Sequence, residues 1–278
     1  MARFDSGWVR IMSGTLPEQN ALGFKAFHLV PGAGVRYLVS LYRLSNGEPL
    51  ALLDGNYLTV ARTSAAAAAA ALKFFGTEPL DVGVIGSGTL ARDGLRALAS
   101  VCRIRSARVY SRSASNRDGY VAELGPELDA ELTAVDSAAA AGEGADMILA
   151  ATQTGGIVAL AAGDLGHPRY ISSVSSTIPT QRELDERVIA SAALVVIDTP
   201  DALHESGDLL AAEEVGLDRE RVVLLADFLE QTPQPHRTPV IYKSIGSVEQ
   251  DLSLAVATWQ EAERQGIGEV IEPIERPR

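Results

Sequence analysis

The chain is poor in the residue types that build disulfides and metal sites. Its 278 residues include a single cysteine, Cys102, which excludes an internal disulfide framework and any site with several thiolate ligands. The four histidines lie far apart, without the spacing of metal ligands: His28, His167, His204 and His236. We therefore predict no metal site and no zinc chemistry.

Long apolar runs are absent as well. No stretch approaches the roughly 18 apolar residues that a membrane-spanning helix needs. The most apolar tract, residues 64–72, is short and nearly all alanine. Residues 1–14 lack the pattern of a secretory signal peptide. We expect a cytoplasmic protein with no membrane partner.

Basic residues are outnumbered by acidic ones. Lys and Arg total 24 against 36 Asp and Glu, which gives a formal charge of −12 and a pI near 4.8. Such a surface argues against nucleic acid as a partner. It leaves room for a local basic pocket that binds a phosphate-bearing ligand. The length suits two domains.

Two kinds of pattern divide the chain. Residues 29–61 are rich in β-formers, and we expect strands at 35–42 and 50–53 and a turn at 54–55. An alanine-rich helix should follow from about residue 62 to 75, with Thr63 or Ser64 as its N-cap. From residue 80 onward strands alternate with helices. We expect strands at 80–86, 105–110, 145–150, 170–174 and 194–197, and helices at 90–100, 117–124 and 248–265.

This alternation predicts an α/β fold, a Rossmann-type doubly wound parallel sheet. A smaller α+β domain would be built from both chain ends. We place the boundaries at 1–77 for the first part of that domain, 78–243 for the dinucleotide-binding domain, and 244–278 for a C-terminal helix that returns to the first part.

A glycine-rich turn follows the first strand of the alternating region. Residues 86–91 match G-x-G-x-x-A between a strand and a helix. Gly86 permits the tight turn, Gly88 lets the backbone approach a pyrophosphate, and small Ala91 allows close packing of helix and strand. We predict dinucleotide binding here, through Gly86, Gly88, Thr89 and Leu90 and the N-terminus of the helix.

The end of the next strand bears on which dinucleotide is bound. An NAD site usually has Asp or Glu there to hold the ribose 2′-hydroxyl. This chain has Ser111-Arg112-Ser113 instead. Arg112 suits a 2′-phosphate, with the two serines as neutral donors, so NADP(H) is favoured over NAD(H). The alternative is an arginine that is merely solvated in a loop.

Six segments, in this order, resemble the ornithine cyclodeaminase/μ-crystallin family. They are residues 23–25, 50–55, 58–65, the glycine turn, 182–185 and 243–251. The stretch from Asp54-Gly55 through Leu58-Thr59 to Arg62-Thr63 is the most specific of them. The resemblance is closest to the NADP-dependent ketimine reductase-like members.

The resemblance implies a homodimer whose substrate and dimerisation domain is formed by both chain ends, and chemistry at an amino or imino carbon. It places Lys25 and Arg62 at the active site, where each can hold a substrate carboxylate and the lysine can also pass a proton. We also assign to the cofactor site residues that follow later strands of the sheet: Thr152, Gln153, Ser175, Lys243 and Ser244.

Two departures from the family pattern affect the function. The chain begins close to the segment that matches Met12, so we expect the upstream carboxylate-binding arginine of family members to be absent. Cyclodeaminases carry an acid in the loop after the fifth strand, whereas this chain has Thr177, which cannot act as a carboxylate base. Ketimine reductase-like members carry a small hydroxyl residue there.

These observations favour an NADP-dependent imine reductase or amino-acid dehydrogenase acting on a small carboxylate-bearing amino or imino acid, with Lys25, Arg62 and Thr177 as catalytic residues. Two alternatives stay open. One is ornithine cyclodeamination, an ammonia-lyase reaction in which the cofactor is reduced and re-oxidised in one turnover. The other is a nucleotide-binding protein with little catalysis.

Overall fold

The computed structural model describes residues 2–232 and 239–271, so His236 lies outside the described part. The chain forms two compact units. One consists of the residues up to 59 together with those from 248 onward, and the other of residues 60–247. Within the described residues, no helix has the length and apolar character needed to cross a bilayer.

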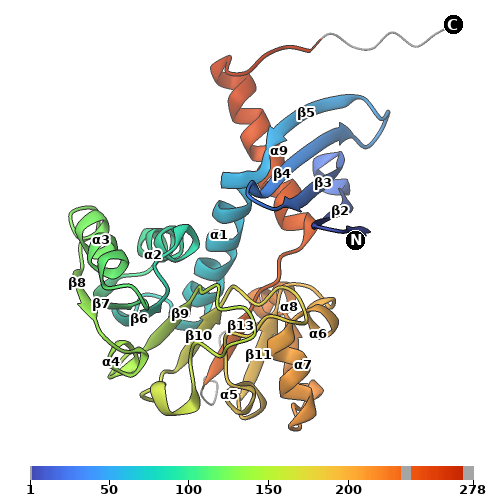
Figure 1. The fold of residues 1–278 in the computed structure, drawn as a ribbon. Helices are drawn as coiled ribbons and strands as arrows, with labels where there is room; N and C mark the ends of the chain where they lie inside the picture. The colour runs from blue at the N-terminus through green and yellow to red at the C-terminus, as the bar shows by residue number, and fades with distance from the viewer. Residues whose placement is uncertain (1, 233–238, 272–278) are drawn as a thin grey trace, which may run out of the picture. The chain divides into compact units, whose positions relative to one another are not determined.

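The first unit is an antiparallel sheet with a helix on one face (Figure 1). Its strands run in chain order: β1 Ala2–Phe4, β2 Gly7–Leu16, β3 Ala21–Val30, β4 Gly34–Arg43 and β5 Pro49–Asp54. The last helix, α9 Val248–Gln265, buries Leu252, Ala255 and Val256 against Val39 and Leu41 of the sheet. The sequence predicted β4, β5 and α9 but not β2 or β3.

The alanine-rich helix α1 spans Gly55–Phe75. The predicted turn at residues 54–55 and the helix start near residue 62 were wrong. The strand β5 passes directly into the helix, because the Asp54 carboxylate accepts a hydrogen bond of 2.8 Å from the Asn56 amide and so ends the strand as a cap would. Farther along α1, Ala67, Ala70 and Ala71 are buried in the core of the second unit, so residues 60–75 pack with that unit.

The second unit is an eight-stranded parallel sheet in the order β12-β11-β13-β10-β9-β6-β7-β8. The strands are β6 Leu80–Ile85, β7 Ile104–Tyr110, β8 Glu131–Val135, β9 Met147–Ala150, β10 Tyr170–Ser173, β11 Leu194–Ile197, β12 Val222–Leu224 and β13 Val240–Lys243. The helices are α2 Thr89–Val101, α3 Ala114–Leu124, α4 Ala138–Gly142, α5 Glu186–Ala190, α6 Ala202–Glu205, α7 Gly207–Glu214 and α8 Leu225–Glu230.

Separate cores form on the two faces of this sheet. Residues of α1, α2, α3 and α8 bury one face, and residues of α4, α5 and α7 bury the other. The chain builds outward from β6 to β8, then returns beside β6 with β9 and continues to the other edge. This is the predicted doubly wound fold with a smaller second sheet. Its strand order reverses between β6 and β9, where such sheets bind ligands at their carboxyl ends.

Candidate functional site

The glycine turn joins β6 to α2 at the point where the strand order reverses. Gly86 has a φ of +119°, and a Cβ there would lie 2.3 Å from the Ala151 carbonyl oxygen. Gly88 caps α2 without a side-chain hydrogen bond, and a Cβ on it would meet nothing within 4 Å. The start of α2 therefore offers backbone amides beside open space, which fits the pyrophosphate of a dinucleotide.

The loop after β7 carries the residues predicted to choose between the dinucleotides. Arg112 is exposed. The Ser113 hydroxyl accepts a bond of 3.3 Å from the Asn116 amide and so caps α3, while the Ser111 hydroxyl donates to the Ser113 carbonyl. A second arginine, Arg117, donates to the Ser111 carbonyl at 3.1 Å. Arg117 was not predicted as a site residue, although its position one turn into the helix after Ser113 indicates this contact.

The loops after β9 and β10 are tied together by one carboxylate. Glu183 is fully buried, and its Oε1 accepts from the amide and the hydroxyl of Thr152 at 2.6 and 2.8 Å. Its Oε2 accepts from the Ser173 hydroxyl at 2.6 Å and the Ser175 amide at 3.3 Å. Gln153 is exposed beside this arrangement. In the sequence Glu183 stands out only as part of a segment that resembles the family, and this role was not predicted.

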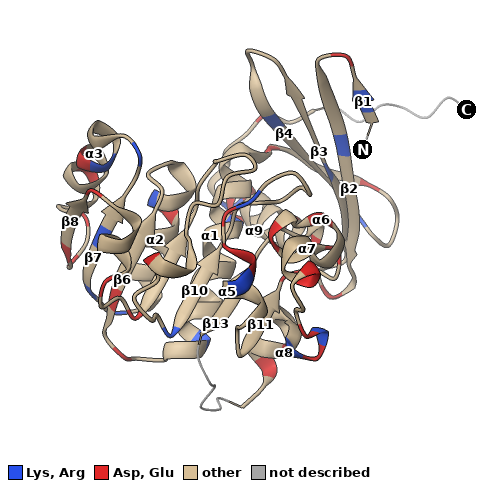
Figure 2. Cartoon of the chain, turned by 60° about the horizontal axis from the view of Figure 1, so that its bottom comes forward, with Lys and Arg blue, Asp and Glu red and all other residues tan. Residues whose placement is uncertain are grey.

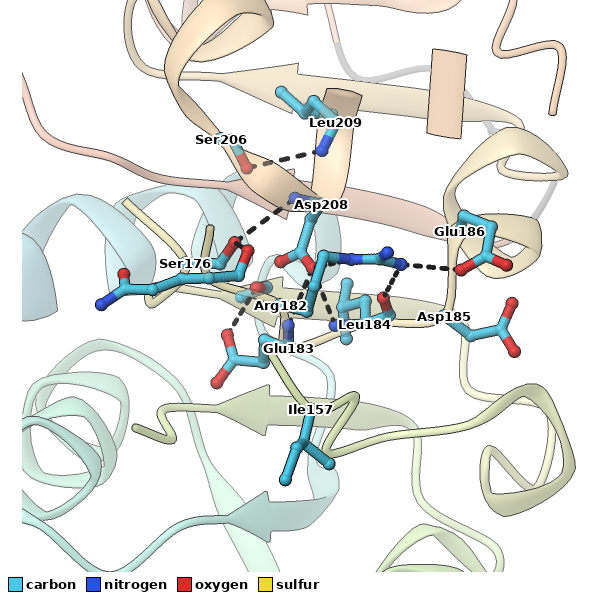
Figure 3. Close-up of polar contacts among 12 residues, drawn as sticks. Ile157, Ser176, Arg182, Glu183, Leu184, Asp185, Glu186, Ser206, Asp208 and Leu209 are labelled. Carbon is cyan, nitrogen blue, oxygen red and sulfur yellow. Dashed lines mark hydrogen bonds and ion pairs between the residues drawn. The ribbon is translucent and has the colours of Figure 1, made fainter. Parts of the chain in front are cut away.

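Lys243 extends this buried network. Its ammonium lies 3.1 Å from Asp208 Oδ2 and donates to the Ser173 hydroxyl at 2.9 Å and to the Ser175 carbonyl. Asp208 Oδ1 in turn accepts from the amides of Glu183 and of the following residue (Figure 3). Lys243, Asp208 and Glu183 are each 0% exposed. The ammonium of Lys243, which the sequence predicted as a cofactor ligand, therefore contacts protein groups in this structure.

A tight turn after β13 supports Arg62. The Asp198 carboxylate accepts from the Ser244 hydroxyl at 2.6 Å and from the Gly246 amide at 2.8 Å. Gly246 has a φ of +88°, and a Cβ on it would lie 2.2 Å from Arg62 Nη2. The buried guanidinium of Arg62 therefore lies directly against this glycine. Ser244, a predicted cofactor ligand, is 1% exposed and bonded to Asp198.

Lys25 lies in the first unit, on the face of the sheet that carries α9. It is 2% exposed, and its ammonium lies 2.5 Å from Oδ2 of the buried Asp251 of α9. The rings of Phe27 and Tyr37 lie 5.3 and 5.5 Å from the same ammonium. A desolvated lysine with a carboxylate partner and aromatic neighbours is suited to hold an anion or to transfer a proton.

Thr177 follows β10 in a loop whose backbone is fixed. Its amide donates to the Gln181 side-chain oxygen at 3.1 Å, and the preceding Ser176 has a φ of +59°. The Ser176 hydroxyl donates to the Gln181 carbonyl at 2.7 Å. Thr177 is partly buried, and its side chain offers a neutral hydroxyl in place of a charged carboxylate.

The second unit thus brings the predicted cofactor residues to the carboxyl ends of parallel strands, around the reversal of strand order. Among the described residues no group of three or more His, Cys, Asp and Glu side chains could hold a metal ion. A glycine turn and an open helix N-terminus at this place in a parallel sheet define the Rossmann class of dinucleotide-binding proteins.

Comparison with known proteins gives the family. Residues 1–265 match the model of the ornithine cyclodeaminase/mu-crystallin family, and the chain belongs to that family. A Delta(1)-pyrroline-2-carboxylate reductase of Bacillus cereus is 27% identical over 274 residues, with 94% of this chain and 84% of the relative covered. Ketimine reductase mu-crystallin of Rattus norvegicus is 29% identical over 222 residues, covering 78% and 66%.

A solved structure agrees with these relatives. Delta(1)-pyrroline-2-carboxylate reductase of Thermococcus litoralis, in complex with NADH and L-proline, matches with a TM-score of 0.87 and 28% identity. The match covers 96% of this chain and 85% of that one. The likeness therefore extends over both units of the fold.

Proposed function

We propose that the protein is an NAD(P)H-dependent reductase of the C=N bond of a small cyclic imino acid such as Δ1-pyrroline-2-carboxylate. The observation that carries the proposal is the likeness, over nearly the whole chain, to reductases with this activity. The glycine turn with its open helix N-terminus supports dinucleotide binding. Thr177 supports reduction over cyclodeamination, because its hydroxyl cannot serve as a carboxylate base.

When bound, the nicotinamide would supply a hydride to the imine carbon. We propose that Arg62 binds the substrate carboxylate, since its guanidinium is buried and held against Gly246. We assign to Lys25 either a second contact to the carboxylate or proton transfer. The Thr177 hydroxyl would then orient the imine as a neutral hydrogen-bond partner.

The test is NADPH and NADH oxidation, followed at 340 nm, with Δ1-pyrroline-2-carboxylate and its six-membered homologue. Steady oxidation with proline or pipecolate as product would support the reductase. Proline and ammonia formed from ornithine would instead support the cyclodeaminase. Tight nucleotide binding without turnover on any of these substrates would leave a nucleotide-binding protein and refute the enzyme.

We propose that NADP(H) is preferred over NAD(H). The loop after β7 has no acid to bind the ribose 2′-hydroxyl and presents the exposed Arg112, with Arg117 fixed to the Ser111 carbonyl beside it. Two guanidinium groups at one strand end favour a 2′-phosphate. The related Thermococcus litoralis enzyme was solved with NADH, so the proposed preference rests on the loop residues of this chain alone.

We further propose a homodimer formed through the face of the antiparallel sheet that does not carry α9. Ile11, Leu38 and Leu52 are 64%, 43% and 58% exposed. The register places them on one face, since Ile11 and Leu38 both pair with Ala26, and Leu52 pairs with Ser40, two residues from Leu38. The charged residues on the strands of this sheet, which Figure 2 colours blue or red, are Arg3, Arg10, Lys25, Arg36, Arg43 and Asp54. The single, buried cysteine fits the reducing cytoplasm that we propose as the compartment.

A further inference from the structure

The carboxylate of Glu183 holds two loops that the sequence assigns to the cofactor. It accepts two bonds from Thr152, which follows β9, and one from the amide of Ser175, which follows β10. β9 lies next to β6 and β10 lies next to β9, so both loops leave the same carboxyl edge of the sheet as the glycine turn. Because these donors serve Glu183, they set the position of the loops and are not available to bind a ligand.

The other side of Ser175 is fixed by a cation. The Ser175 carbonyl accepts from Lys243, so the amide and the carbonyl of one loop residue are held by two buried side chains of opposite charge. Ser173 joins them, since its hydroxyl donates to Glu183 and accepts from Lys243. Hydrogen bonds among buried charged groups hold the loop in place more firmly than exposed ones would.

The network closes on Asp208 at the start of α7. Asp208 pairs with Lys243 at 3.1 Å and accepts from the backbone amide of Glu183 itself at 2.8 Å. Arg182 lies between two carboxylates, 3.4 Å from Asp208 Oδ1 and 2.7 Å from Glu186 Oε2. Removal of one partner from a buried ion pair is strongly destabilising, because it leaves the other charge uncompensated.

We propose that Glu183 is a positioning residue for the nicotinamide half of the cofactor. It acts through the loops at Thr152 and Ser175, with Lys243 and Asp208 holding it in place. The pyrophosphate and adenosine half is served by the glycine turn after β6 and the loop after β7, which lie outside this network. The inference rests on the proposed function, because it assumes that a nicotinamide dinucleotide is bound.

The test compares two ligands that differ by the nicotinamide. NADPH and 2′-phospho-ADP-ribose, which keeps both riboses but lacks the nicotinamide base, are titrated by calorimetry against the parent, Glu183→Gln and Thr152→Val. Glu213→Gln is the matched control, since Glu213 lies on α7, as Asp208 does, and pairs with the exposed Arg219 outside this network. Thermal unfolding of each variant is measured alongside.

We expect Glu183→Gln to weaken NADPH binding at least about tenfold, since hydrogen bonds to a charged group are lost. Binding of 2′-phospho-ADP-ribose should stay within about twofold of the parent value, and Glu213→Gln should leave the affinity for both ligands unchanged. Thr152→Val should show the same split to a smaller degree, and the double variant should lose less than the two single losses combined.

Equal weakening of both ligands, or no weakening of either, would overturn the positioning role and leave Glu183 as a stabilising residue. Should Glu183→Gln not fold, Thr152→Val and Ser173→Ala test the same contacts from the loop side, with the same split expected. Failure of the parent protein to bind NADPH or NADH would refute the proposed function itself, which is a different outcome.

Discussion

At the scale of single residues, Arg112 is the side chain on which the proposed cofactor preference depends. Arg112→Ala should weaken NADPH binding at least about tenfold, because a charge-assisted contact to the 2′-phosphate is worth roughly 1.5–3 kcal/mol. NADH binding should not change. Fluorescence titration of both nucleotides measures the difference, with Arg103→Ala as the control at the opposite end of the same strand. An unchanged NADPH preference in Arg112→Ala would contradict the assignment.

Lys25 is the second residue whose proposed role can be separated from its structural one. Lys25→Met should lower kcat/KM at least about a hundredfold while NADPH binding is kept, since a charged contact in a dry site is worth roughly 2–5 kcal/mol. The variant also leaves the buried carboxylate of Asp251 without its ion-pair partner, which destabilises the fold.

A double variant distinguishes the two effects. Lys25→Met with Asp251→Asn removes both charges of the buried pair, so the thermal midpoint should recover toward the parent value. Activity should stay low. If the double variant regained activity together with stability, Lys25 would be a structural lysine and the active-site assignment would fail.

Gly246 offers a test of Arg62 that leaves the arginine in place. A Cβ at residue 246 would lie 2.2–2.6 Å from three atoms of the guanidinium group, so Gly246→Ala should displace Arg62 and raise KM for the imino acid at least about tenfold. The positive φ adds strain of about 1–2 kcal/mol. Gly216→Ala is matched for that strain, with a φ of +98° and nothing within 4 Å, and should leave KM unchanged.

Residue identities indicated some of these roles and not others. Arg62 and Lys25 stand out in the sequence because they fall in segments that resemble a family. Glu183 and Gly246 gain their roles from partners 31 and 184 positions away, Thr152 and Arg62. Such long-range pairs depend on which strand ends the sheet brings together, which local patterns do not specify.

At the scale of elements, burial on both faces explains only some of the predicted strands. β9 and β11 are continuous apolar runs because helices cover both sides of a parallel sheet. β13 is buried along its whole length as well, but it was not predicted. β2 and β3 were missed because their outward face is apolar too, with Ile11 and Phe24 beside inward Met12 and Lys25. The alternation of polar and apolar residues that marks a strand with one buried face was therefore blurred.

Close packing of α9 on β3 depends on a glycine. A Cβ on Gly23 would lie 2.3 Å from the Ser40 carbonyl oxygen and 2.8 Å from Leu252 Cδ2. Gly23→Ala should therefore destabilise the protein by about 1–3 kcal/mol, as overpacking does, which urea unfolding measures. Gly119→Ala in α3, where a Cβ would meet nothing within 4 Å, should be neutral or slightly stabilising. Equal stability of the Gly23→Ala variant and the parent would show that the helix can shift without cost.

At the scale of the whole molecule, the sequence predicted that the two chain ends belong to one unit. α9 packs on β2, β3 and β4, as a returning helix with an apolar face requires. The boundary was harder to place, because an alanine-rich helix that spans residues 55–75 gives no break in pattern at residue 59, where the units divide. Alanine suits both a surface helix and close packing on a sheet, so composition alone does not assign it.

The proposed dimer makes a prediction about charge as well as about contact. Ile11→Arg should convert the protein to a monomer in analytical ultracentrifugation, since it places a charge in the centre of an apolar face. Val215→Arg, at an exposed apolar site in the second unit, should leave the mass unchanged.

Each chain carries a formal charge of −12, so two chains repel each other at low ionic strength. Raising salt from about 10 mM to 150 mM shortens the Debye length from roughly 30 to 8 Å. The dimer should therefore tighten over that range, whereas an interface held by ion pairs would weaken.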